Sequence, residues 1–143
     1  MSHRTPTLIS CLRLGRLAEA TTNIHLGAQG FDATAFLLLT LLDEEGPADS
    51  AAGLGQMVGL SRQAAHQALE RLERDDLVRR APSREDRRAI TWHLEPRGRR
   101  WLEFLRGLLG DVEHRLCRAA DAGAVERLRD ALPPPIRLAG YDG

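Results

Sequence analysis

The sequence predicts a mainly α-helical protein of the α+β class with one small β-hairpin. Apolar residues recur at the three- and four-residue spacing of helices in both halves of the chain, whereas residues 89–94 alternate between apolar and polar side chains. The length of 143 residues suits one compact unit, or a small domain with added dimerisation helices.

Two helices are expected in the N-terminal third. The first covers residues 6 to about 27 and places Leu8, Leu12 and the stem of Arg16 on one stripe. After a glycine-rich break, Asp32 can cap a second helix. That second helix is apolar almost all round, so we expect it to be central and buried.

The central third predicts two further helices separated by a tight turn. Residues 46–50 form a loop, and the short helix that follows ends at Gly59, a residue that tolerates a left-handed backbone. Ser61 can cap the next helix. That helix has an inner apolar stripe (Ala65, Ala68, Leu69 and Leu72) and an outer polar face (Gln63, His66, Gln67, Glu70 and Arg74), with Arg62 at its leading edge.

The C-terminal half predicts a hairpin followed by a long helix. Residues 77–81 and 89–94 are the expected strands, and Pro96 suits the first turn of the helix. A short last helix should end at the proline run 133–135. Apolar residues of the long helix are spaced as in a heptad seam: Leu102, Leu105, Leu109, Val112 and Leu116. This seam can pack within the subunit or against a twofold mate, and we expect a mixture.

The helices on either side of the turn are a candidate helix-turn-helix. In such folds the second helix lies in the major groove and offers its first residues to base edges. The residues expected to contact DNA are Ser61, Arg62, Gln63, Ala64, His66 and Gln67. The alternative is an ordinary helical hairpin with a solvated polar face, and the helix pair alone does not decide between the two.

The tip of the hairpin favours the DNA-binding interpretation. It carries Arg84, Arg87 and Arg88 within five residues, and arginines at such a tip can enter a narrow minor groove. Asp86 would repel phosphate there, so we expect it to pair with a neighbouring Arg and orient the tip. A merely solvated run of charges is the alternative, which the adjacent helix makes less favourable.

Charge is distributed unevenly along a chain whose formal net charge is zero. Binding to nucleic acid by bulk charge alone is therefore disfavoured. Residues 60–100, however, contain eleven Arg and seven acidic residues. All twenty basic residues are Arg, which suits phosphates and guanine edges. Arg also replaces Lys outside this region, so a GC-rich genome is the favoured explanation.

Three segments share the spacing of one known family. The run 86–88 (Asp-Arg-Arg) is followed by Leu94 and then by Gly98, residues 54–61 enter the helix-turn-helix, and residues 72–80 lead from its second helix into the hairpin. All three resemble the MarR family of bacterial winged-helix regulators, and the layout of leading helices, winged domain and trailing helices covers nearly the whole chain.

The resemblance implies a winged helix-turn-helix that acts as a homodimer on a pseudopalindromic operator in double-stranded DNA. It also implies modulation by an oxidant or a small effector, for which we expect an aromatic or drug-like molecule. A repressor is expected rather than an activator. Residues 46–95 would form the DNA-binding domain, and residues 1–45 and 96–143 the helical dimerisation region. Leu8, Leu12 and the heptad seam are the expected dimer contacts.

Three residues depart from the family's pattern. Glu95 stands where Thr is usual and is a poorer N-cap for the final helix. Asp76 replaces a usual Gly at the exit from the recognition helix, where a left-handed backbone is expected. Gly55 replaces a usual Ala inside a short helix and should weaken that helix by roughly 1 kcal/mol.

The two cysteines raise a redox hypothesis. The resemblance implies peroxide-sensing relatives with a cysteine at the place of Cys11 in the first helix, activated by tyrosine partners. The only Tyr here is Tyr141 in the tail, so an inert, packed Cys11 is favoured. Cys117 adjoins the seam and should pack there.

Catalysis, cofactors and membranes are not indicated. There is no phosphate-binding loop, nucleophile elbow or carboxylate pair, and Cys and His show no metal-ligand spacing. Neither a signal peptide nor a membrane-spanning apolar run is found, so a cytoplasmic protein is expected. The alternatives to a ligand-modulated regulator are a winged-helix protein-interaction module and a thiol-based redox regulator acting through Cys11.

Overall fold

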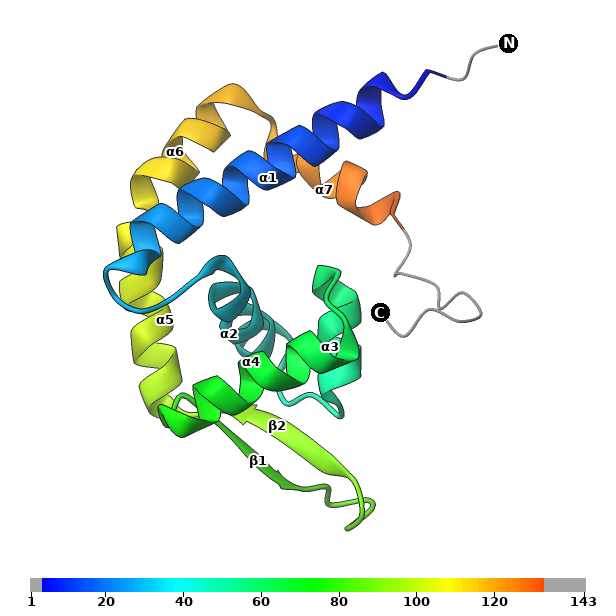
Figure 1. Ribbon diagram of the computed structural model, residues 1–143, viewed down its shortest axis with the longest axis vertical. Coiled ribbons are helices and arrows are strands. Elements are labelled where there is room, and N and C mark those ends of the chain that lie inside the picture. Colours follow the sequence, from blue (N-terminus) through cyan, green and yellow to red (C-terminus); the bar gives the residue numbers. More distant parts are fainter. Residues whose placement is uncertain (1–3, 133–143) are drawn as a thin grey trace.

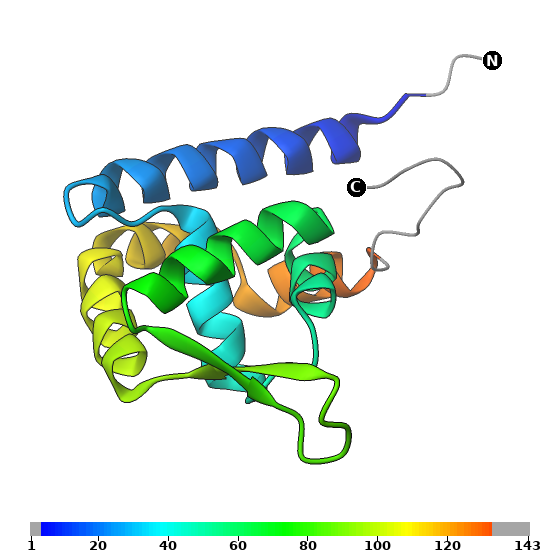
Figure 2. The ribbon, with the colours of Figure 1, turned by 60° about the horizontal axis from the view of Figure 1, so that its bottom comes forward.

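The computed structural model describes residues 4–132 and confirms a mainly helical chain with a two-stranded antiparallel hairpin (Figure 1). α1 and the hairpin lie at opposite ends of the molecule, and α5 connects the two ends along one side (Figures 1 and 2). The elements are α1 (Pro6–Gly27), α2 (Ala33–Glu45), α3 (Ala51–Val58), α4 (Arg62–Arg74), β1 (Val78–Pro82), β2 (Ile90–Leu94), α5 (Pro96–Leu108), α6 (Gly110–Ala119) and α7 (Ala122–Asp130).

The predicted helix ends are confirmed where a side chain or a glycine defines them. The Asp32 carboxylate accepts a hydrogen bond from the Ala35 backbone at 2.8 Å, which caps α2. The Ser61 hydroxyl accepts one from the Ala64 backbone at 3.0 Å, which caps α4. Gly59 ends α3 with φ +72°, the left-handed backbone expected there.

The hairpin has a third, very short partner segment that the sequence does not predict. Val78 pairs with Leu94 at one end, and Pro82 with Ile90 at the other. In addition, Ala48 and Trp92 exchange two backbone hydrogen bonds of 3.0 and 2.8 Å. Part of the loop 46–50 therefore extends the sheet by one short rung, which fixes the hairpin against the segment that precedes α3.

One hydrophobic core joins α2, α3, α4, the hairpin and α5, and we call this unit the winged lobe. Its largest fully buried side chains include Leu38, Leu39, Leu69, Leu77, Leu102 and Leu105. The prediction that α2 is central is confirmed. The boundaries predicted at residues 45 and 95 remain a proposal about which segments bind DNA and which form the dimer. In the structure, α2 and α5 pack into the same core as residues 46–95.

Two glycines allow close backbone approaches inside the winged lobe. A Cβ on Gly98 would collide with the carbonyl oxygen of Leu77 and lie 2.7 Å from Leu94 Cδ1. A Cβ on Gly55 would lie 3.0 Å from both Ala65 Cβ and the Leu60 carbonyl oxygen. Gly98 therefore allows α5 to pack on the backbone that joins α4 to β1, and Gly55 allows α3 to pack closely on α4.

The expected long final helix is two helices. The break falls at Leu109, whose backbone (φ −93°, ψ 1°) ends α5 and leads directly into α6. Gly107 and Gly110 flank this position and lower the helix propensity there. α7 then begins after Asp121, whose carboxylate accepts a hydrogen bond from the Gly123 backbone at 2.9 Å. The proline run 133–135 lies outside the described residues.

The heptad seam divides at this break, and the predicted dimer contacts need a correction. Leu102 and Leu105 are fully buried in the core of their own chain, and Leu109 is nearly so. They have no surface left for a second copy. Val112 is half-buried and Leu116 is exposed. Most apolar residues of α1 are exposed too: Leu8, Ile9, Leu12, Leu14, Leu17 and Ile24.

Candidate nucleic-acid interface

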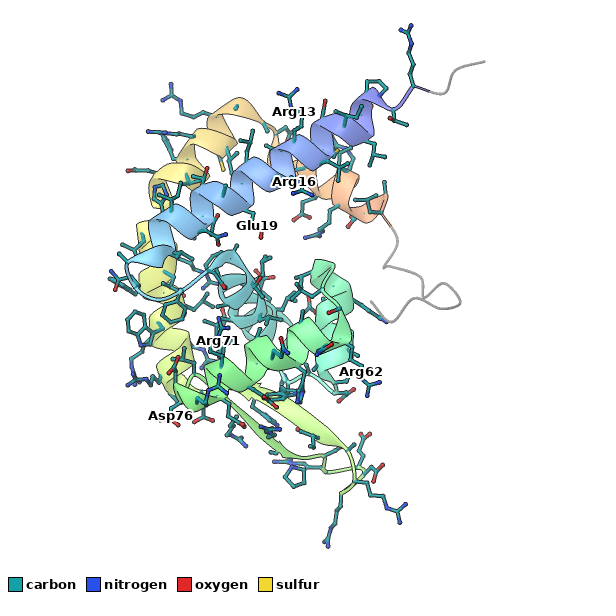
Figure 3. All side chains as sticks on the ribbon, in the orientation of Figure 1. Arg13, Arg16, Glu19, Arg62, Arg71 and Asp76 are labelled. Atoms are coloured by element: carbon teal, nitrogen blue, oxygen red, sulfur yellow. The ribbon has the colours of Figure 1, made fainter. Side chains whose placement is uncertain are left out.

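The outer face of α4 presents the polar side chains that the sequence assigns to DNA. Arg62, Gln63, His66 and Gln67 are exposed, whereas Ser61 and Ala64 are half-buried at the start of the helix. Arg62 lies at the end of α4 next to α3, and Asp76 lies beyond the opposite end (Figure 3). Along the inner side of the helix, three apolar residues anchor it in the core: Ala65, Leu69 and Leu72.

The His66 side chain contacts two neighbours, Glu70 and Trp92. Its Nε2 atom lies 2.7 Å from a carboxylate oxygen of Glu70, one turn along α4. Its ring also meets the Trp92 indole edge-on, with 6.1 Å between ring centroids and an interplanar angle of 81°. The exposed face of α4 therefore runs directly beside the hairpin.

Glu73 and Arg80 connect α4 to β1 in a way that the sequence did not reveal. Glu73 accepts hydrogen bonds from the Arg80 backbone at 3.0 Å and from Arg80 Nε at 2.9 Å. The hydrogen bond from the Arg80 side chain holds the pKa of the Glu73 carboxyl below its usual value. The Arg80 guanidinium also lies 5.2 Å from the centroid of the Trp92 ring. Trp92 thus packs against His66 and beneath Arg80, which fixes the hairpin relative to α4.

The hairpin tip projects away from the helices (Figure 1), and Arg84, Arg87 and Arg88 are all exposed on it. Asp86 does not pair with an arginine side chain as predicted. Its carboxylate accepts a hydrogen bond from the Arg88 backbone at 2.9 Å, and its carbonyl accepts one from the Ala89 backbone at 3.0 Å. Asp86 therefore shapes the tip through the backbone, as an Asx turn does, and leaves the guanidinium groups free of it.

The base of the hairpin is joined to α5 by polar contacts. Arg79 lies 2.7 Å from the Glu95 carboxylate. Behind it, the Thr91 hydroxyl is 3.2 Å from the Ala81 carbonyl and 2.8 Å from His93 Nε2. Burial, with the Arg79 charge as a second cause, lowers the pKa of His93.

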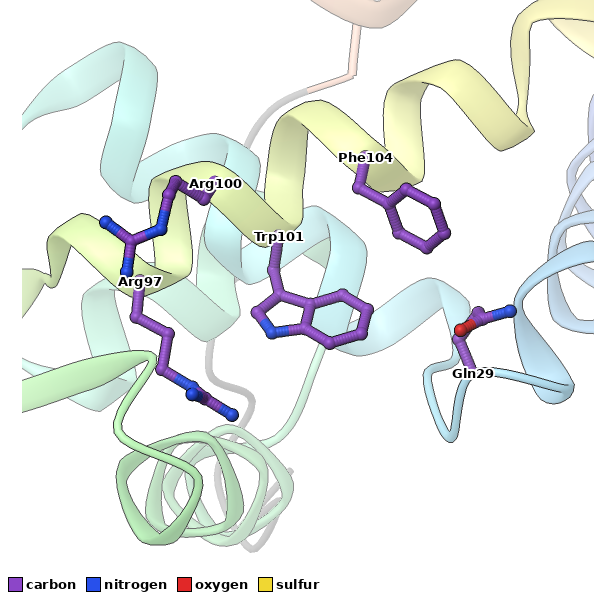
Figure 4. Close-up of a pocket in the computed structure, with 5 residues that line it drawn as sticks. All are labelled: Gln29, Arg97, Arg100, Trp101 and Phe104. Carbon is purple, nitrogen blue, oxygen red and sulfur yellow. The ribbon is translucent and has the colours of Figure 1, made fainter.

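A pocket of about 320 Å³ opens beside the start of α5. Trp101 and Phe104 project from α5 toward the loop that carries Gln29, with Arg97 and Arg100 at the end away from Gln29 (Figure 4). The Trp101 ring also lies 5.2 Å from the Phe31 ring and 5.5 Å from the Phe104 ring, between centroids. The pocket combines flat aromatic surface with two cations.

The cysteines differ in environment. Cys11 is half-buried on α1, and Cys117 is exposed on α6 instead of packing as expected. Cys117 Sγ lies 3.3 Å from a carboxylate oxygen of Glu113, and this hydrogen bond raises the pKa of the Cys117 thiol. That pKa leaves less of the reactive thiolate near neutral pH. Tyr141 lies outside the described residues.

Within residues 4–132, no helix has the length and apolar character needed to cross a bilayer. No group of three or more His, Cys, Asp or Glu side chains is arranged there to hold a metal ion.

Residues 29–89, which run from the α1–α2 loop through the hairpin tip, match the MarR family. This segment, which holds α2, α3, α4, β1 and the hairpin tip, is similar to the MarR family. A comparison with curated protein sequences gives no match.

Three solved structures share the fold along nearly the whole chain. The regulator BldR from Sulfolobus solfataricus has 22% identity and a TM-score of 0.78, covering 88% of this chain and 91% of that one. CouR from Rhodococcus jostii RHA1, bound to p-coumaroyl-CoA, has 22% identity and a TM-score of 0.72, covering 87% and 91%. A MarR-family protein from Mycobacterium tuberculosis, in complex with p-aminosalicylic acid, has 20% identity and a TM-score of 0.66, covering 90% and 95%.

The three departures from the MarR-family pattern have structural counterparts. Asp76 adopts φ +60°, the left-handed backbone expected at that position. Glu95 makes no side-chain cap for α5 and pairs with Arg79 instead. Gly55 does not only weaken α3 as expected, because its missing Cβ permits the close contact with Ala65 and Leu60.

Proposed function

We propose that this protein is a MarR-family transcriptional regulator, namely a homodimeric repressor that binds a pseudopalindromic operator. α4 would lie in the major groove, where Gln63, His66 and Gln67 reach base edges, and the arginine tip would enter the flanking minor groove. One observation carries this proposal. The contact between His66 and Trp92 places the exposed face of α4 directly beside the hairpin, so both elements can approach one duplex together.

The exposed apolar residues of α1, α6 and α7 support a second copy of this chain as the dimer partner. Leu12 on α1 and Leu116 on α6 keep 57% and 42% of their surface exposed. α7 adds three more exposed apolar residues: Val125, Leu128 and Leu132. Burial of such surface drives association. With twofold symmetry, the two α4 helices would read half-sites about 10 bp apart.

The pocket beside α5 supports an aromatic, anionic effector. The rings of Trp101 and Phe104 can stack on a planar ligand. Arg97 and Arg100 can bind its carboxylate or phosphate groups. The bound molecules of CouR and of the Mycobacterium tuberculosis relative both contain an aromatic ring and an anionic group. Because the pocket joins α5 to the α1–α2 loop, a ligand there would influence how the winged lobe is held.

Binding of the upstream intergenic DNA as a function of salt tests the DNA-binding proposal. Arg88→Ala should weaken binding to all sequences and reduce the slope of log K against log salt by about 1, because one phosphate contact is lost. Gln67→Ala should relax selectivity at one base pair. Arg118→Ala, on exposed α6, is the matched control and should bind normally.

Two outcomes would contradict the proposal. Normal binding by Arg88→Ala would exclude the arginine tip as a DNA contact. The absence of any saturable, sequence-selective binding by the wild type would instead support the protein-interaction module.

A further inference from the structure

We propose that Glu70 sets the hydrogen-bonding state of His66, so that His66 reads an adenine or cytosine amino group through its Nδ1 atom. This inference rests on the proposed function, in which α4 occupies the major groove. It adds Glu70 as a positioning residue and assigns a base preference to His66.

The contact between His66 and Glu70 determines which ring nitrogen carries hydrogen. A glutamate carboxylate can only accept hydrogen bonds. His66 Nε2 lies 2.7 Å from Glu70 Oε1, so Nε2 must be the donor. In the neutral imidazole the other nitrogen, Nδ1, then keeps its lone pair and acts as an acceptor.

Trp92 fixes the orientation of the same ring. Its indole is 3% exposed and meets the His66 ring edge-on. Trp92 is itself held by the two backbone hydrogen bonds with Ala48 and by the Arg80 guanidinium above its ring. His66 nevertheless keeps 47% of its side-chain surface exposed. The ring is thus oriented by two neighbours and still accessible to a ligand.

The charged groups around the His66 ring are arranged to leave this acceptor available. From its own helix, Glu70 bonds to Nε2. From β1, the Arg80 guanidinium is engaged by Glu73 and by the Trp92 ring. Nε2 is therefore occupied by Glu70 before DNA arrives, and the contact with a base is assigned to Nδ1, the other ring nitrogen.

The base preference follows from the donors in the major groove. The amino groups at adenine N6 and cytosine N4 donate there, whereas guanine presents only the acceptors N7 and O6. An Nδ1 acceptor on a pre-oriented ring favours adenine or cytosine and disfavours guanine at one position of each half-site. One such contact should change the preference by roughly tenfold.

The test uses a set of operators in which each half-site position is replaced in turn by each of the four bases. Binding to every operator is measured for the wild type and for variants of His66 and Glu70. The wild type should prefer adenine or cytosine at one position by roughly tenfold. His66→Ala should abolish that preference. Glu70→Ala should reduce it. Adding Glu70→Ala to His66→Ala should cause no further change in base preference. Glu70→Gln should retain it, because the amide oxygen of Gln can still accept a hydrogen bond from Nε2.

The Gln variant separates this role from simple charge. Glu70→Ala and Glu70→Gln both remove a negative charge beside DNA, so both should raise affinity for all sequences alike. Only Glu70→Ala should alter the base preference. Glu113→Ala, on exposed α6, is the control for an unrelated carboxylate and should leave the preference intact. Nitrogen chemical shifts of His66 in the free protein should show hydrogen on Nε2 in the wild type.

Three results would overturn the inference. These are a preference for guanine, an unchanged preference in Glu70→Ala, and hydrogen on Nδ1 of neutral His66. If wild-type binding is selective but insensitive to both residues, the inference fails and the proposed function stands. If the wild type shows no sequence-selective binding, the proposed function fails with it.

Discussion

The winged lobe and the terminal helices α1, α6 and α7 contain similar apolar residues but use them differently. Leucines of the lobe converge on one core, in which Leu38, Leu69 and Leu102 have no exposed surface. By contrast, α6 and α7 have no buried residue, and on α1 only Leu26 is buried. The lobe buries most of its large apolar side chains within one chain, whereas the terminal helices leave most of theirs exposed. Leucine spacing therefore predicts a helix face but not which chain covers it.

The largest effect is expected inside the winged lobe, where α5 begins. Gly98→Ala should destabilise the protein by about 4 kcal/mol or more, because its new Cβ collides with the Leu77 backbone, which cannot move without displacing α5. Gly107→Ala, on the same helix, has open space and should stabilise by up to about 1 kcal/mol. Urea unfolding measures both. Equal stability of the two variants would show that α5 does not depend on this close approach.

The next effect distinguishes the two halves of the heptad seam. Leu102→Ala should lower the free energy of unfolding by about 3 kcal/mol at every protein concentration, because it leaves a cavity in the core of the lobe. Leu116→Ala should act mainly by weakening self-association. Urea unfolding at two protein concentrations, with sedimentation analysis, separates the cases. If Leu116→Ala lowered the free energy of unfolding of the monomer as much as Leu102→Ala does, Leu116 would belong to the core.

Helix caps provide a smaller test of the same comparison. Ser61→Ala should lower the free energy of global unfolding by about 1 kcal/mol, because α4 lies in the cooperative core. Asp121→Ala removes the analogous cap of α7, which has no buried residue. It should increase local hydrogen exchange in α7 with little change in global stability. A global effect of Asp121→Ala as large as that of Ser61→Ala would show that α7 unfolds together with the lobe.

The smallest effect is a pH dependence in the lobe. The pKa of His93 in the folded protein is lowered, so the unfolded chain binds a proton more readily. The resulting stability is fully present above the unfolded pKa of about 6.5 and is lost as pH falls toward the lower folded value. His93→Gln should remove this dependence in urea unfolding between pH 7.5 and 5. His114→Gln, on exposed α6, should retain it; the same loss in both variants would contradict the assignment to His93.

Much of the candidate DNA interface could be predicted because its signals are local. The caps at Asp32 and Ser61 and the left-handed turn at Gly59 depend on residues within one helical turn, and the structure places them as predicted. The spacing from the hairpin tip to Gly98 likewise indicated the MarR family. The prediction that Asp86 pairs with an arginine side chain was wrong. An aspartate in a turn can bond to a guanidinium or to the backbone, and the sequence alone does not distinguish these two partners.

Contacts between elements could not be read from the sequence. Glu73 meets Arg80, and His66 meets Trp92, only because α4 and the hairpin pack side by side. The pocket likewise forms only where α5 approaches the loop that carries Gln29. Each of these depends on distances between segments that local spacing does not specify.

Local sequence was enough to predict the mainly helical class, the helix caps and the arginine tip, because each depends on residues that are neighbours in the chain. Tertiary structure decided which leucines of the seam are buried, why position 98 must be glycine, and which carboxylates hold His66 and Arg80. The physical reason is that burial and pairing require two surfaces to meet. A periodic sequence describes only one of those surfaces.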